Sequence, residues 1–145
     1  MVIQSIQVKS FFLNAYKSLI LAEPAKAALV DVASGHVAKV EWTHFPFVRF
    51  FGREPEEGAL EKVEASYAKI RDMHFDKGQT WLANGEMSIA DIQLATRLSM
   101  AIHVGDYNVE EKFPEIMKGY NEIVKMPEWQ SVEKTMVDYI ATLGK

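Results

Sequence analysis

The sequence predicts an all-α fold, a bundle of five or six helices, and three observations support this prediction. Residues 85–105 open with the signals of a helix start and continue with apolar side chains at helical spacing. Amphipathic stretches with the same spacing lie on both sides of this segment. Proline occupies the first position of three other predicted helices, where its missing N–H costs no hydrogen bond: Pro24, Pro114 and Pro127.

Length and composition are those of one globular domain, residues 1–145. The chain is 48% apolar and 25% charged, enough for a single core. Its net charge of −4 argues against nucleic acid as a partner, and the absence of cysteine excludes disulfides and thiolate metal sites. No apolar run approaches the roughly 20 residues that span a bilayer. We expect a cytoplasmic protein; import into an organelle is the alternative, because no acidic residue precedes Glu23.

The first predicted helix, residues 5–22, is an extra element at the N-terminus of the domain. It carries two apolar stripes at helical spacing. The first contains Val8, Phe11, Phe12, Ala15 and Leu19, and the second Ile6, Leu13 and Ile20. A helix that is apolar on two sides needs two neighbours. Either both belong to its own core, or one stripe docks on another chain.

The next predicted helix, residues 24–45, has an apolar line that we expect to face inward: Leu29, Val32, His36 and Val40. Pro46 should kink or end this helix, since its ring clashes with the preceding turn. Around this proline, residues 42–51 concentrate aromatic side chains: Trp42, Phe45, Phe47, Phe50 and Phe51. These rings either fill the core or line an apolar pocket.

A third helix is predicted over residues 59–75, and its charged residues indicate a solvated face. Its inner face should contain Leu60, Val63, Tyr67 and Ile70.

Residues 85–105 have the strongest local signals. Ser88 is a good N-cap residue, and Asp91, three residues later, can bond back to the N–H of the cap, which makes a capping box. Met87 and Ile92 occupy the two positions of a hydrophobic staple. The apolar series that follows is Ile89, Ile92, Leu94, Ala95, Leu98, Ala101 and Ile102. We therefore expect the central helix of the bundle, with Asp91 desolvated, hydrogen-bonded and structural, not a catalytic acid.

Two helices are predicted to close the chain. The inward side chains of the first would be Ile116, Met117, Tyr120, Ile123 and Val124, and those of the second Trp129, Val132, Met136 and Ile140.

The segments "SIADIQLATRL" and "FPEIMKGYNEIVKMPEWQSV" resemble the capping-box segment and the closing helix pair of the glutathione transferase family, in its all-helical C-terminal domain. Residues 81–85, "WLANG", resemble the approach to that capping box, and "EPAKAALVD" loosely resembles the start of the domain. The resemblance extends from Pro24 to Tyr139 and implies the bundle predicted above.

In that family, glutathione binding and thiol activation belong to a thioredoxin-like N-terminal domain, for which this sequence has no room. The segment "VKSFFLNAYKSL" also lacks the Glu-Ser pair with which the family holds glutathione. The resemblance therefore implies no catalytic residue and no cofactor in this chain, with glutathione bound only if another polypeptide supplies the missing domain. We expect a non-catalytic module that assembles with another protein or a second copy of itself through residues 5–22 and 42–51.

Two other functions stay open. The chain could be the electrophile-binding half of a glutathione transferase, with His44, Phe47 and Phe51 lining an apolar pocket, or a carrier of a small apolar ligand in that pocket.

Metal chemistry has little support in the sequence. The four histidines are His36, His44, His74 and His103, and none has a second histidine four residues away. We expect no metal site, and we interpret His36 and His74, which lie on apolar helix faces, as hydrogen-bonded core residues.

Overall fold

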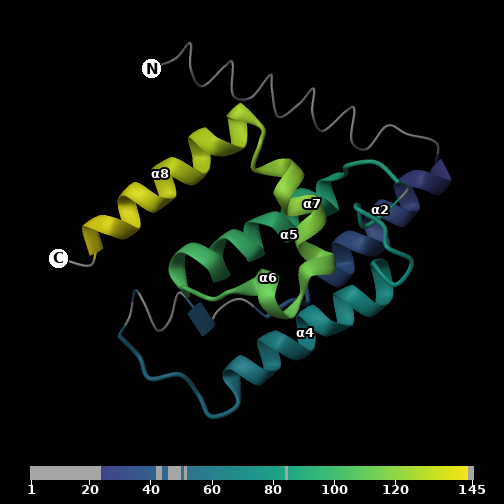
Figure 1. Ribbon diagram of the computed structural model, residues 1–145. Helices are drawn as coiled ribbons and strands as arrows, with labels where there is room; N and C mark the ends of the chain where they lie inside the picture. Colours follow the sequence, from purple (N-terminus) through teal and green to yellow (C-terminus); the bar gives the residue numbers. More distant parts are fainter. Residues whose placement is uncertain (1–23, 42–43, 46–49, 51, 84, 144–145) are drawn as a thin grey trace.

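The computed structural model describes residues 24–41, 44–45, 50, 52–83 and 85–143, and these residues form helices and no strand (Figure 1). The α-helices are α2 (Pro24–Val37), α4 (Ala59–His74), α5 (Ile89–Ser99), α6 (Val109–Lys112), α7 (Pro114–Ile123) and α8 (Pro127–Leu143), and the π-helical segment η1 (Met100–Val104) continues α5. The all-α prediction is confirmed. The predicted helix 5–22 lies outside the described residues.

Helix α5 is the centre of the bundle. It packs against α2 on one side and α7 on the other, and it buries Ala90, Leu94, Ala95 and Leu98. Ala90 and Ala95 have small side chains, so neighbouring helices can approach the backbone closely. The central position predicted for this helix is therefore correct.

The end of α5 changes its hydrogen-bond pattern. In η1 the N–H of Gly105 donates to the carbonyl of Met100, five residues earlier, over 3.2 Å. Such π-turns insert an extra residue in each hydrogen-bonded ring and alter the direction of the following side chains. The side chain of His103 therefore points toward α8.

Helix α2 differs from its prediction in length and in orientation. It ends at Val37 and is followed by a turn, eight residues before the predicted end. Leu29 and Val32, predicted to face inward, are 55% and 53% exposed, while Val30, Ala33 and Val37 form the buried face. The helix is apolar on several sides, so spacing alone did not select one face. The structure turns the smaller alanine and valine side chains toward α5.

Two other predicted inward residues face solvent. Leu60 on α4 and Val132 on α8 are exposed. The other predicted residues of α4 are buried: Val63, Tyr67 and Ile70. On α8, Trp129, Met136 and Ile140 do pack against the core, and Glu133 lies on their line in place of Val132. None of the helices in the described ranges could cross a membrane.

Candidate functional site

The predicted apolar pocket can be followed in the structure only at His44. Phe47 and Phe51 lie outside the described residues. His44 is partly buried, its ring lies edge-on to Phe45 at a centroid distance of 5.1 Å, and its Nδ1 is buried with no hydrogen-bond partner in the described part of the chain. The pocket stays a prediction.

Phe45, next to His44, belongs to the core. It is 4% exposed, and its ring centroid lies 5.8 Å from that of Tyr107. The ring rests on Gly105, where an added Cβ would come within 2.2 Å of it. At this position the aromatic segment serves packing, and Gly105 is needed for the close approach.

Tyr107 connects this aromatic contact to a charged group. Its hydroxyl donates to Glu64 Oε1 over 2.8 Å, and Lys112 forms an ion pair with the same oxygen. The hydrogen bond from Lys112, followed by that from Tyr107, lowers the pKa of the Glu64 carboxyl. The group joins α4 to the segment around α6.

Ser88 and Asp91 form the capping box at the start of α5. Asp91 Oδ2 accepts hydrogen bonds from the N–H and the hydroxyl of Ser88, and Oδ1 accepts one from the N–H of Leu82, each over 2.8 Å. Burial raises the pKa of the Asp91 carboxyl, and these hydrogen bonds oppose the rise. All three donors are fixed by the fold, so Asp91 joins the preceding loop to the helix. Met87 and Ile92, the predicted staple pair, are both partly buried and pack against the core.

His36 and His74 bond to each other. His36 Nδ1 on α2 and His74 Nε2 on α4 lie 3.0 Å apart, and His74 Nδ1 lies 3.2 Å from the carbonyl oxygen of Leu82. Because a carbonyl only accepts, Nδ1 of His74 carries the proton; in the neutral pair His36 then donates to Nε2 of His74. The pair joins two helices to the loop that Asp91 holds.

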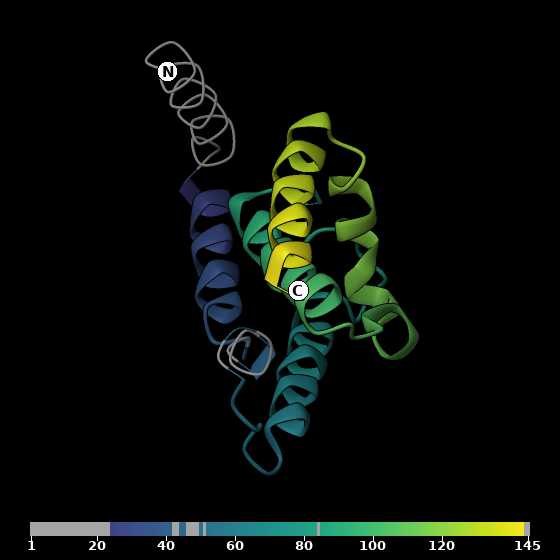
Figure 2. The same ribbon diagram turned by 90° about the vertical axis from the view of Figure 1, so that its left-hand side faces the viewer.

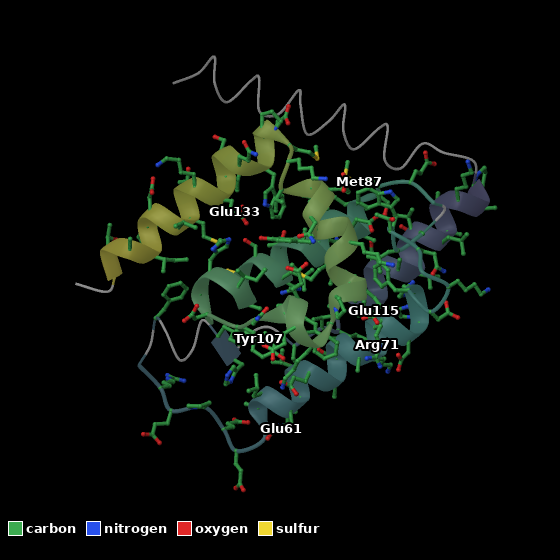
Figure 3. The ribbon with its side chains drawn as sticks, viewed as in Figure 1. Glu61, Arg71, Met87, Tyr107, Glu115 and Glu133 are labelled. Atoms are coloured by element: carbon green, nitrogen blue, oxygen red, sulfur yellow. The ribbon has the colours of Figure 1, made fainter. Side chains whose placement is uncertain are left out.

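A second carboxylate, which is partly buried, lies between α8 and the rest of the bundle (Figure 3). Glu133 Oε1 accepts hydrogen bonds from Ser99 Oγ over 3.0 Å, His103 Nε2 over 3.0 Å and Tyr120 OH over 2.7 Å. Burial opposes ionisation of Glu133, but the donors, with Tyr120 first, lower the pKa of its carboxyl.

The arrangement of these groups offers structural links. Ser99 and His103 both donate to Glu133 and not to each other, so they do not form the hydroxyl–base pair of a nucleophilic site. Within the described ranges, no group of three or more histidine, aspartate or glutamate side chains could hold a metal ion.

A comparison with known families identifies the kind of domain that this chain forms. The family model for "Glutathione S-transferase, C-terminal domain" matches residues 18–127, more than half of the chain. This chain belongs to that family. No curated protein matches it.

In this glutathione transferase C-terminal domain, some of the polar groups described above lie inside the residue range that matches the family and one lies outside it. Asp91, the histidine pair and Glu64 lie inside the matched range, which ends at Pro127, the first residue of α8. Glu133 therefore lies outside it. Sequence reasoning missed this residue; the available signal was a carboxylate placed among apolar residues on the inward line of α8.

Proposed function

We propose that this chain is a non-catalytic, cytoplasmic module that assembles with another protein or with a second copy of itself. The observation that carries the proposal is the outer face of α8, where Val132 is 66% exposed and Tyr139 is 61% exposed. These residues are seven apart, so they lie on one line of the helix. Tyrosine is enriched at interfaces because its ring is apolar and its hydroxyl can bond.

The polar groups of the domain agree with a role in binding and not in catalysis. Asp91 and Glu133 are each held by donors from within the fold, so neither carboxylate is free to activate a thiol. We propose no cofactor; glutathione would require a thioredoxin-like domain from another polypeptide. Residues 5–22 and 42–51 remain proposed contact segments.

The test is recovery of a partner. A tagged full chain should bring down a complex from its native source, and replacing Val132 and Tyr139 together by Asp should reduce the recovered partner at least ~10-fold, the effect of losing about 1.4 kcal/mol. The matched control replaces Leu60 and Met73, exposed apolar residues on α4, by Asp and should leave recovery unchanged. Sedimentation should separate a second copy from a different protein.

Two outcomes would contradict the proposal. One is a wild-type chain that is monomeric at all concentrations and recovers no partner. The other is a clear rate above background when the purified chain is mixed with glutathione and a model electrophile.

A second candidate is the electrophile-binding half of a glutathione transferase. It is supported by the buried Nδ1 of His44, which has no hydrogen-bond partner among the described residues and lies next to a segment that includes Phe47 and Phe51. A small apolar ligand carrier would use the same residues without glutathione. If they line a pocket, replacing both phenylalanines by Ala should abolish binding of an apolar dye. If they are core residues, each replacement should instead cost about 3–5 kcal/mol of stability.

A further inference from the structure

Helix α8 is attached to the bundle at a point where the charge can change with pH. The helix lies on the outside of the bundle, where it contacts η1 (Figure 2). At this contact Glu133 Oε1 accepts hydrogen bonds from Ser99 on α5, His103 on η1 and Tyr120 on α7. One carboxylate of α8 therefore meets donors from three other elements.

His103 is the residue that gives this contact its sensitivity to pH, because histidine is the side chain that ordinarily changes its charge between pH 5 and 8. Ionised Glu133 can only accept, so Nε2 of His103 carries the proton of their 3.0 Å hydrogen bond. The His103 side chain is 30% exposed, so a proton from solvent can reach the ring. Protonation converts a hydrogen bond from a neutral imidazole into an ion pair with the carboxylate.

The other groups at this contact keep their charge in the same pH range. Burial and the hydrogen bond to Glu133 raise the pKa of the Tyr120 hydroxyl, so it stays neutral. Burial opposes ionisation of Glu133, but its donors lower the pKa of the carboxyl, so it stays ionised. Ser99 on α5 does not titrate. Protonation of His103 therefore neutralises the net negative charge of the group.

We propose that Ser99, His103, Tyr120 and Glu133 form a proton-sensitive latch, which holds α8 more tightly when His103 is protonated. Detachment of α8 from the protonated form breaks an ion pair in addition to the other hydrogen bonds, so it costs more free energy than detachment from the neutral form. The helix should therefore open less often as the pH falls from 7.5 to 5.5. A monomeric chain would show this effect too, so the latch does not depend on the assembly function.

Local opening of α8 isolates this effect better than unfolding of the whole chain. In complete unfolding, the partial burial of His103 opposes the attraction of Glu133 for its charged form. Complete unfolding also breaks the contact of His74 with His36, at which burial disfavours the charged form of His74. An opening of α8 alone leaves this second contact in place.

Amide hydrogen exchange of the full chain tests the latch, because it measures the opening of individual elements. The rates are corrected for intrinsic exchange at each pH. We expect the opening constant of α8 to be about 3-fold smaller at pH 5.5 than at pH 7.5, the effect of a single ion pair. His103→Gln retains a neutral donor and should remove this dependence on pH.

Two further variants separate the latch from other sources of pH dependence. Glu133→Gln replaces the carboxylate by a neutral amide, so α8 should open more readily at both pH values and without dependence on pH. His74→Gln removes a histidine that lies outside the latch and should leave the dependence unchanged.

An opening constant of α8 that is equal at the two pH values in the wild type, or larger at pH 5.5, would overturn the proposal. A dependence on pH that persists in His103→Gln would overturn it as well, because another group would then be the source.

Discussion

Asp91 is a charged side chain in the interior of the bundle, 4% exposed, and three hydrogen bonds of 2.8 Å hold it there. Two of its donors are the backbone N–H groups of Leu82 and Ser88. A buried N–H without an acceptor costs about 1–3 kcal/mol, and the carboxylate removes this cost at both groups.

Removing Asp91 should therefore harm the fold more than removing its partner hydroxyl. We expect Asp91→Ala to lower the free energy of unfolding by about 2–4 kcal/mol, because it leaves two buried N–H groups unpaired. Ser88→Ala removes one hydroxyl donor and should cost about 1 kcal/mol. Urea unfolding followed by circular dichroism measures both. Equal losses would mean that Asp91 does not hold the loop.

Two tyrosines of the core provide a second prediction. Tyr67 is fully buried, and its hydroxyl has no hydrogen-bond partner in the described part of the chain, whereas Tyr107 OH donates to Glu64. Tyr67→Phe should leave stability unchanged or raise it by up to about 1 kcal/mol, since it removes an unsatisfied buried group. Tyr107→Phe should cost about 1 kcal/mol. The same unfolding experiment compares them, and a larger loss for Tyr67→Phe would reveal a partner of its hydroxyl.

At the scale of elements, we expect the histidine pair to make the packing of α2 on α4 sensitive to pH. Burial lowers the pKa of His74, and the nearby His36 acts in the same direction; the Leu82 carbonyl and Asp91 oppose them. The folded state therefore binds fewer protons than the unfolded chain just below the ordinary pKa of about 6.5. Stability should be complete above this value and fall as pH drops through the lower pKa of the folded state.

The measurement is the free energy of unfolding between pH 7 and pH 5. His74→Gln removes the titrating group and should flatten the curve in this window. The lowered carboxyl pKa values of Glu64 and Glu133 affect stability only below about 4.5, so they do not obscure it. An unchanged slope in the variant would exclude His74 as the source.

Local sequence signals predicted some elements well. The start of α5 depends on residues three apart, Ser88 and Asp91, so spacing was sufficient to predict it. The starts of α7 and α8 were predicted from single residues, because each helix begins at a proline. The inward face of α2 was predicted wrongly, because a helix with apolar residues on several sides can turn either line toward α5.

Contacts between distant residues could not be predicted this way. His36 and His74 are 38 residues apart, and Glu133 meets residues 34, 30 and 13 positions away. Their bonds depend on how the helices cross and on the π-helical segment η1, which contains His103. The pocket proposed at His44, Phe47 and Phe51 depends on such contacts too.

At the scale of the whole molecule, the helices of the bundle differ in how much of their surface is buried against the others. Helix α5 is enclosed by α2 and α7. On α8, Ile140, 7% exposed, is the one buried side chain among its described residues; Trp129, Glu133 and Met136 are only partly covered. The hydrogen bonds of Glu133 to Ser99, His103 and Tyr120 add to these few apolar contacts in attaching α8. Regions with few buried apolar contacts open before the rest of a protein unfolds.

We therefore expect amide hydrogen exchange to show α8 opening at a lower free energy than α5. Glu133→Gln should widen this difference by about 1–2 kcal/mol. The amide is neutral, so it accepts weaker hydrogen bonds from Ser99, His103 and Tyr120 than the carboxylate does. Glu128→Gln, an exposed change on the same helix, should leave exchange unchanged. If α8 and α5 exchange at the same free energy in the wild type, the two helices unfold together as one cooperative unit. That result would contradict a separate opening of α8 that is limited by the hydrogen bonds of Glu133.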